Sequence, residues 1–203
     1  MIKAIIFDVG GVIVNTSALF DNLVDIFKPQ DNDKFWILLN EKLAPLCRNE
    51  ISEQEFWNDM VSVTGTSKSR IPKDFWAKYS EKFLSVNNDV LKIAKELKSG
   101  YRIGIISNSI AAQADLNSEL GIYDDFDSVI LSHEIGITKD SKEIFILASN
   151  NLGVKTNQCL FIDDVKRCVD VAESVGMKGI LFKNAKELRD ELTSLLKQQV
   201  SAK

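Results

Sequence analysis

The sequence contains very little histidine or cysteine, and this scarcity narrows the chemistry that we expect. The single histidine, His133, is expected to be a loop or packing residue without a catalytic role. The three cysteines, Cys47, Cys159 and Cys168, are odd in number and irregularly spaced, which argues against both a disulfide framework and a zinc site. The function must therefore rest on other side chains.

The sequence also has no excess of basic residues and no long apolar runs. The net charge is −4 and no basic cluster stands out, so nothing indicates binding to nucleic acid or to a membrane surface. The apolar stretches are too short to cross a bilayer, and Asp8, Gly10 and Gly11 interrupt the apolar N-terminus, unlike a signal peptide. We expect a cytoplasmic protein in which local charge or a metal attracts any anionic substrate.

Five short, continuously apolar runs are typical of strands buried on both faces of a sheet. They cover residues 4–7, 103–106, 129–131, 160–162 and 179–182. Helical patterns lie between and after the later runs, and glycines stand where these helices should end. The alternation predicts an α/β fold with a parallel sheet covered by helices on both faces.

Residues 16–86 contain helical patterns only. We expect about four helices there, with Pro45 ending or kinking the second, a Ser52–Glu55 capping box opening the third and Pro72 near the first turn of the fourth. All three tryptophans lie in this segment and predict a small aromatic core of its own. The predicted division is therefore a core of residues 1–15 and 87–203 with a helical insert, 16–86, above the end of the first strand.

Polar side chains stand where the predicted strands end. They are Asp8 after the first strand, Ser107 and Asn108 after the second, Lys139 in the loop beyond the third, and Asp163 and Asp164 after the fourth. The C-terminal ends of parallel strands share one edge, and neighbouring strands lie about 4.8 Å apart. We therefore expect these groups to converge in one crevice, where open α/β sheets bind ligands.

The residue types in this crevice suit phosphoryl transfer. An exposed carboxylate with a pKa near roughly 4 is ionised at neutral pH and can act as a nucleophile. Hydroxyl, amide and ammonium groups can hold the oxygens of a phosphate. Neighbouring carboxylates repel each other, and Mg²⁺ relieves this repulsion by taking their oxygens as ligands. The sequence thus predicts an Mg²⁺-assisted phosphoryl-transfer site around Asp8.

Four short motifs in this order resemble the haloacid dehalogenase-like (HAD) hydrolase superfamily over essentially the whole chain. They are Phe7-Asp8-Val9-Gly10-Gly11-Val12, Ile106-Ser107-Asn108, the segment from Ser132 to Lys139, and Phe161-Ile162-Asp163-Asp164. The resemblance implies a Rossmann-like core with five parallel strands and a small C1-type helical cap inserted after the first strand. The pattern is most similar to small sugar-phosphate phosphatases whose first motif reads Asp-x-Gly.

The same resemblance implies roles for individual residues. Asp8 would be the nucleophile that forms an aspartyl-phosphate, and Lys139 would stabilise both nucleophile and phosphate. Ser107, Asn108 and Gly10 would contact the phosphate. The implied ligands of Mg²⁺ are Asp8, the Gly10 backbone carbonyl oxygen, Asp164 and, in or near the coordination shell, Asp163.

Three positions depart from the family pattern. Gly10 stands where many phosphatases of the family carry a second aspartate as general acid and base. Asp140 replaces the proline that commonly follows the motif lysine, and Cys168 replaces an asparagine or aspartate four residues after Asp164. The first change bears on the rate of catalysis and the third on the support of the metal.

Several functions remain open from the sequence. The leading hypothesis is an Mg²⁺-dependent phosphatase acting on a small phosphorylated metabolite such as a sugar phosphate, with Asn15 and Thr16 at the hinge of the insert placed to reach it. A haloacid dehalogenase would use the same aspartate without metal, but the Asp163–Asp164 pair argues against it. A mutase is disfavoured by Gly10. The alternative is a phosphate-binding or interaction protein that kept the fold but whose catalytic activity is weakened.

Overall fold

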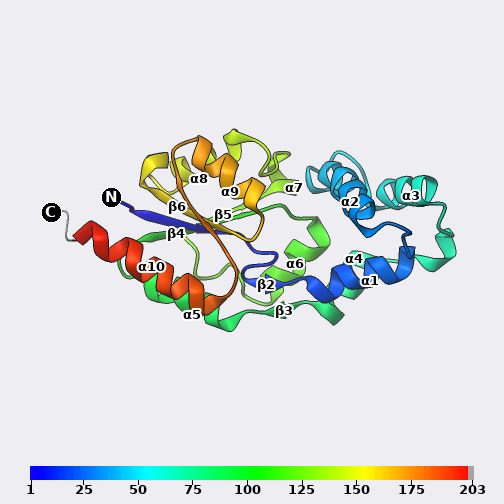
Figure 1. Cartoon of the computed structure of the whole chain (residues 1–203), viewed down its shortest axis with the longest axis horizontal. Coiled ribbons are helices and arrows are strands. Elements are labelled where there is room, and N and C mark those ends of the chain that lie inside the picture. The colour runs from blue at the N-terminus through cyan, green and yellow to red at the C-terminus, as the bar shows by residue number, and fades with distance from the viewer. Residues whose placement is uncertain (201–203) are drawn as a thin grey trace.

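The computed structural model describes residues 1–200, and a five-stranded parallel sheet forms its centre (Figure 1). The strands lie in the order β5-β4-β1-β6-β7, and every neighbouring pair is parallel. Their bounds are β1 Ala4–Phe7, β4 Arg102–Ser107, β5 Ser128–Leu131, β6 Cys159–Asp163 and β7 Lys178–Leu181. The five predicted strands and the α/β class are confirmed, because continuously apolar strands can be buried on both faces.

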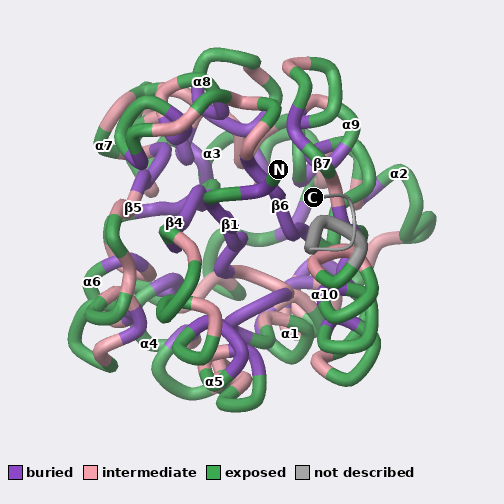
Figure 2. Tube along the Cα trace, turned by 90° about the vertical axis from the view of Figure 1, so that its left-hand side faces the viewer, coloured by how far each residue is buried: buried purple, intermediate pink, exposed green. Residues whose placement is uncertain are grey.

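Helices cover both faces of this sheet, and the side chains of β1 alternate between them. Ile5 and Phe7 pack in one core with α5 and α10, whereas Ala4 and Ile6 pack in another with α8 and α9. Figure 2 shows β1 buried in the middle of the molecule. The bounds of these helices are α5 Asn88–Leu97, α8 Lys142–Asn151, α9 Lys166–Ser174 and α10 Ala185–Val200. The remaining helices of this part are α6 Ala111–Glu119, α7 Ser132–Ile135 and the 3₁₀ turn Thr156–Gln158.

A two-stranded antiparallel ribbon carries the chain out of the sheet region and back again. It pairs β2 (Val14–Asn15) with β3 (Ser85–Val86). Between the two strands lie α1 Ser17–Phe27, α2 Asn32–Cys47, α3 Glu53–Thr64, a 3₁₀ turn Lys68–Arg70 and α4 Phe75–Phe83. We call residues 17–83 the helical segment; Figure 1 shows it on the side of the molecule where α6 and α7 lie.

The helical segment has an apolar core of its own, as the sequence predicted. Trp57 and Trp76 stack with ring centroids 5.5 Å apart, and Phe56 and Phe75 surround them. Ile110, at the start of α6, also belongs to this cluster and connects it to the sheet region. The separate core explains how four short helices stay folded although they contribute nothing to the sheet.

The helix boundaries lie close to the sequence signals. The Ser52–Glu55 capping box opens α3 as expected. Pro45 lies in the last turn of α2, which ends at Cys47. Pro72 precedes α4, which begins at Phe75. Within residues 1–200, none of the helices has the length and apolar character needed to span a bilayer.

Candidate active site

The polar residues that follow the strands meet at the C-terminal edge of the sheet. Asp8 directly follows β1, and its backbone N–H donates to the carbonyl oxygen of Ile162 in the neighbouring β6 (2.9 Å). Ser107 ends β4 and Asp163 ends β6. The strand pairing therefore places them around Asp8, because β4 and β6 are its two direct neighbours.

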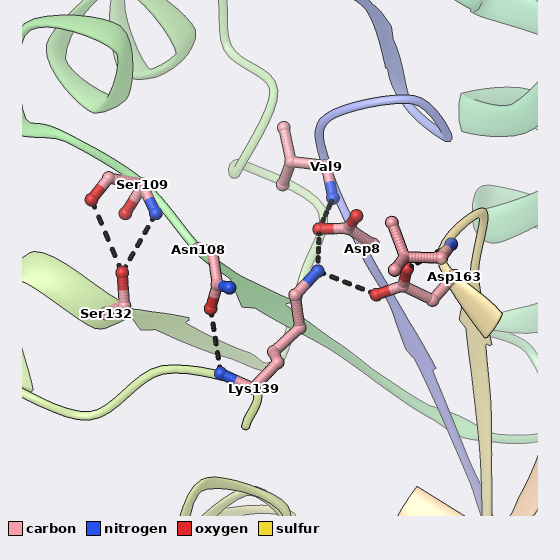
Figure 3. A network of polar contacts seen from close by, with 8 residues as sticks. Asp8, Val9, Asn108, Ser109, Ser132, Lys139 and Asp163 are labelled. Atoms are coloured by element: carbon pink, nitrogen blue, oxygen red, sulfur yellow. Dashed lines mark hydrogen bonds and ion pairs between the residues drawn. The ribbon is translucent and has the colours of Figure 1, made fainter. Parts of the chain in front are cut away.

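Lys139 connects these strand ends through its side chain (Figure 3). Its Nζ lies 2.7 Å from Asp8 Oδ1 and 2.7 Å from Asp163 Oδ2, and all three side chains are buried. The Lys139 backbone N–H donates to Asn108 Oδ1 (2.9 Å), so the loop that carries the lysine is attached to the end of β4. This bond occupies the Asn108 oxygen and leaves its amide nitrogen available as a donor.

The three carboxylates of the site differ in how many of their oxygens are free of hydrogen bonds. Asp8 Oδ1 accepts from Lys139 and from the Val9 backbone N–H (2.7 Å), whereas no described residue bonds to Asp8 Oδ2. Both oxygens of Asp163 are occupied, Oδ2 by Lys139 and Oδ1 by the Val165 backbone N–H (2.8 Å). The side chain of Asp164 bonds to no other described residue. Asp8 Oδ2 and Asp164 are therefore the oxygens that remain free for a ligand.

Burial and mutual repulsion destabilise the ionised forms of the carboxylates. Burial raises the pKa of the Asp8 carboxyl to about 7; Asp163 and Asp164 act in the same direction, and Lys139 opposes them. Burial and Asp163 also raise the pKa of Asp164. Burial alone would lower the pKa of Lys139, but the carboxylates of Asp8 and Asp163 outweigh it and raise that pKa. Lys139 is thus a fixed positive charge that only partly compensates the acids.

The donor set fits a hard divalent cation. One oxygen from each of Asp8, Asp163 and Asp164 lies within 4.8 Å of the others. Carboxylate oxygens are the ligands that Mg²⁺ prefers, and a positive ion would remove the repulsion that raises the pKa values of Asp8 and Asp164. Because both Asp163 oxygens are already bonded, Asp8 and Asp164 are the better placed of the three.

Two adjacent glycines form the loop after β1, and they differ in whether a side chain could replace the hydrogen atom. Gly11 has φ +84°, and a Cβ on it would lie 2.1 Å from Asp164 Oδ2, so glycine is required there for two reasons. Gly10 lacks a left-handed φ, and a Cβ on it would meet only Thr16 Cγ2 at 3.6 Å, an ordinary contact. The role of Gly11 is not apparent from the sequence, where its only signal is the Gly-Gly pair.

A cavity of about 830 Å³ opens from this edge of the sheet toward the helical segment. On the sheet side it is lined by Asp8, Gly10, Asn108, Thr138, Lys139, Asp140, Asp164, Val165, Arg167 and Cys168. On the other side it is lined by Thr16, Phe20, Ile37, Asn40, Glu41, Leu43, Ala44, Cys47, Trp76, Ile110 and Gln113. Two expected site residues, Ser107 and Asp163, are buried beside the cavity without lining it. Thr16 lines it and Asn15 does not.

The two other departures from the family pattern also lie at this cavity. Asp140 and Arg167, which both line the sheet side of the cavity, form an ion pair (2.8 Å). Burial raises the pKa of the Cys168 thiol to about 12, so the thiol is neutral near pH 7 and adds no charge to the acidic cluster. Neither residue bonds to Asp8 or Asp164 among the residues described.

A hydrogen-bond network supports the end of β4, and no sequence motif indicates it. The Ser109 backbone N–H donates to Ser132 Oγ (2.9 Å), and the Ser132 hydroxyl donates to the carbonyl oxygen of Cys47 at the end of α2 (2.7 Å). Ser109 Oγ also bonds to His133 Nδ1 (2.8 Å), which agrees with a packing role for the histidine. The network joins the end of β4, α7 and the helical segment, and Figure 3 shows the part of it between Ser109 and Ser132.

Comparisons with known proteins agree with this geometry. The family model for haloacid dehalogenase-like hydrolases matches residues 2–176. The D-ribitol-5-phosphate phosphatase of Bacteroides thetaiotaomicron is 27% identical, covering 97% of this chain and 99% of that protein. The glyceraldehyde 3-phosphate phosphatase of Methanopyrus kandleri is 24% identical, covering 92% and 86%.

The fold is also found among solved structures. A HAD family enzyme from B. thetaiotaomicron, solved in complex with magnesium and inorganic phosphate, superimposes with a TM-score of 0.69 at 22% identity, covering 91% of this chain and 96% of that one. A HAD-like family hydrolase from Porphyromonas gingivalis gives a TM-score of 0.70 at 24% identity, covering 97% and 98%. With the sequence match over residues 2–176, the chain belongs to the haloacid dehalogenase-like hydrolases.

Proposed function

We propose that the protein is an Mg²⁺-dependent phosphatase that hydrolyses a small phosphorylated metabolite, such as a sugar phosphate, through an aspartyl-phosphate on Asp8. The observation that carries this proposal is the bonding of Asp8: Lys139 and Val9 hold Oδ1, while Oδ2 is left free beside the cavity. A carboxylate fixed by one oxygen presents the other in a defined direction, which is what a nucleophile requires.

Mg²⁺ would be held by Asp8, Asp164 and the backbone carbonyl oxygen of Gly10. Bound there, the ion would neutralise the carboxylates and screen the incoming phosphate, so that the nucleophile stays ionised at neutral pH. Asp163 would act indirectly, because its oxygens already hold Lys139 and the Val165 N–H.

The individual residues have separate roles in the two steps of hydrolysis. Asp8 Oδ2 attacks phosphorus, the bond from phosphorus to the ester oxygen breaks, and the leaving alkoxide takes up a proton from water to give the alcohol. Water attacks the phosphorus of the aspartyl-phosphate, which releases inorganic phosphate and restores the Asp8 carboxylate. Lys139 Nζ and Asn108 Nδ2 are donors for the phosphate oxygens, and the Ser107 hydroxyl stays a predicted contact.

Residues 16–86 would act as a cap on the core formed by residues 1–15 and 87–203. The two short strands β2 and β3 are the chain connections between these parts, and the cavity lies between the helical segment and the strand ends. Closure over Asp8 would exclude water from the aspartyl-phosphate until the alcohol has left.

Relatives support a phosphorylated metabolite as the substrate. The two curated relatives are phosphatases of D-ribitol 5-phosphate and glyceraldehyde 3-phosphate, and the B. thetaiotaomicron structure holds magnesium and inorganic phosphate. A metal-free dehalogenase is disfavoured, because Lys139 pairs with Asp8 and Asp163 only, and the third clustered carboxylate, Asp164, adds repulsion that a cation would relieve. An inert phosphate-binding protein is the second candidate, because Gly10 removes the usual acid.

Phosphate release from an aryl phosphate, with and without Mg²⁺, tests this proposal. We expect turnover that requires Mg²⁺, is abolished in Asp8→Asn and is unchanged in Asp115→Asn, an exposed aspartate on α6. Asn keeps the shape of the side chain but loses both the nucleophilic charge and a strong metal ligand. Binding of phosphate without turnover would favour the inert protein, and turnover in Asp8→Asn would exclude the covalent mechanism.

A further inference from the structure

One face of α2 lines the cavity along much of the length of the helix. Ile37, Asn40, Glu41, Ala44 and Cys47 all contribute to the cavity wall. Their spacing of three and four residues is that of neighbours on one helical face. The helix therefore lies along the cavity, and its successive turns contact successive parts of any ligand.

The Cys47 end of this face is the end near the phosphate site. The buried Ser132 hydroxyl, directly after the end of β5, fixes the Cys47 carbonyl oxygen, and Cys47 and Lys139 line the same cavity. With a rise of about 1.5 Å per residue, Asn40 and Glu41 lie roughly 9–10 Å farther along the helix than Cys47. Ile37 lies about 15 Å from Cys47 along the same axis.

Asn40 and Glu41 are the two polar residues on this otherwise apolar face of α2. The Glu41 carboxylate is exposed and bonds to no described residue. Asn40 Nδ2 donates to the Trp36 carbonyl oxygen (2.9 Å), which leaves Asn40 Oδ1 as an acceptor. Both groups thus offer acceptors at the same height of the cavity, between the apolar side chains of Ala44 and Ile37.

We propose that Glu41, with Asn40 beside it, selects the substrate by its end remote from the phosphate. The matching substrate is a phosphate monoester with a carbon chain of pentose or hexose length and a hydrogen-bond donor, hydroxyl or ammonium, at that end. With carbon–carbon bonds of about 1.5 Å, a pentose phosphate held at Asp8 extends two bonds farther along α2 toward Glu41 than a triose phosphate does. This inference rests on the proposed phosphatase function and extends it to a substrate class.

Esters with equivalent leaving groups separate end-group recognition from leaving-group chemistry. The series is pentyl phosphate, 5-aminopentyl phosphate, ribitol 5-phosphate and glycerol phosphate, all with primary alkoxide leaving groups, and phenyl phosphate as the reference for turnover. We expect kcat/KM to be about tenfold or more higher for the aminopentyl and ribitol esters than for pentyl phosphate, the worth of one charge-assisted hydrogen bond. Glycerol phosphate should lack this advantage.

Two substitutions of Glu41 distinguish the two kinds of donor. Glu41→Gln keeps an acceptor without charge, so both ratios should fall, and the ratio of aminopentyl to pentyl phosphate should fall more than the ratio of ribitol to pentyl ester. Glu41→Ala should lower both ratios, mainly through KM. Glu81→Gln, an exposed carboxylate on α4 outside the cavity wall, is the matched control and should change neither ratio.

The outcomes separate this inference from the proposed function. Hydrolysis of phenyl phosphate with equal kcat/KM for the three five-carbon esters would overturn the inference and leave the phosphatase intact. An equal effect of Glu41→Ala on glycerol phosphate and on the long esters would also overturn it, because length would then play no part. Failure to hydrolyse any ester, phenyl phosphate included, would remove the proposed function and the inference with it.

Discussion

The Ser132 hydroxyl donates a hydrogen bond of 2.7 Å to the carbonyl oxygen of Cys47, 85 residues away in the sequence. Ser132 opens α7, directly after β5, and Cys47 ends α2, so the bond joins the sheet region to the helical segment. The same hydroxyl oxygen accepts from the Ser109 backbone N–H and lies 3.3 Å from the Ser109 carbonyl oxygen. A hydroxyl has one proton, so it serves one of the two carbonyl oxygens at a time.

We expect Ser132→Ala to lower the free energy of unfolding by about 1–3 kcal/mol, because the buried Cys47 oxygen and Ser109 N–H lose their partner. KM for a phosphate ester should rise, since Asn108 is next to the loosened Ser109. Urea denaturation and steady-state kinetics measure the two effects. Ser149→Ala is the control: it is equally buried but loses only a bond within its own helix. Equal stabilities of the two variants would contradict the role of Ser132.

The occupied oxygens of Asp163 predict an unequal response of the acidic pair to substitution. Asp164→Asn should weaken Mg²⁺ binding by more than about 100-fold, because it removes a ligand, whereas Asp163→Asn should weaken it by the roughly 10–100-fold typical of an indirect partner. Calorimetric titration of Mg²⁺ into the purified variants measures this directly. A larger loss of affinity in Asp163→Asn would reverse the assignment of the inner ligand.

The pKa of Asp8 predicts how the stability of the metal-free protein depends on pH. The pKa of this carboxyl is about 7 in the folded protein, against an ordinary value of 3.8 for an aspartate in an unfolded chain, so the native state holds the proton more tightly between these limits. The contribution of Asp8 to stability is therefore present below about pH 4 and is lost as the pH rises to about 7, at no more than about 1.4 kcal/mol per pH unit.

Thermal unfolding in EDTA tests this sign. Asp8→Asn should melt above the wild-type protein at pH 8, and the difference should disappear toward pH 4. Added Mg²⁺ at pH 8 should stabilise the wild type more than Asp8→Asn, since the ion binds the folded carboxylate. Asp115→Asn provides the exposed control. A difference in melting temperature that is the same at pH 4 and pH 8 would show that Asp8 does not titrate in this range.

The room around Gly10 predicts that an acid can be restored there. Gly10→Asp should fold, because a Cβ meets only Thr16 Cγ2 at 3.6 Å. It should raise kcat/KM for alkyl phosphates, whose alkoxide leaving groups need a proton, by up to the roughly 10²–10⁴-fold that a positioned acid contributes, and less for aryl phosphates. Kinetics across esters of graded leaving-group pKa measure the gain.

Gly11→Ala is the matched control for that substitution. It should lower both stability and Mg²⁺ affinity, because φ is +84° and the new Cβ would displace the Asp164 carboxylate. A wild-type dependence on leaving-group pKa that is already flat, with chemistry rate-limiting, would mean that another residue supplies the proton.

The sheet and the convergence of the site residues follow from the sequence. Short apolar runs such as residues 4–7 are typical of buried strands, and parallel strands bring their C-terminal ends to one edge. Asp8, Asn108 and Asp163 therefore lie together whatever the details of packing. The capping box at Ser52 and Glu55 is equally local, because its bonds join residues three positions apart.

The different roles of these groups follow from tertiary contacts. The close approach of Gly11 to Asp164, the double occupation of Asp163 and the bond from Ser132 to Cys47 join residues that no local pattern relates. The face of α2 that carries Glu41 is turned to the cavity by the packing of the helical segment, not by its own periodicity, since α2 has apolar residues on more than one side. Local propensity specifies elements, whereas the contacts of side chains from different elements arise only when those elements pack.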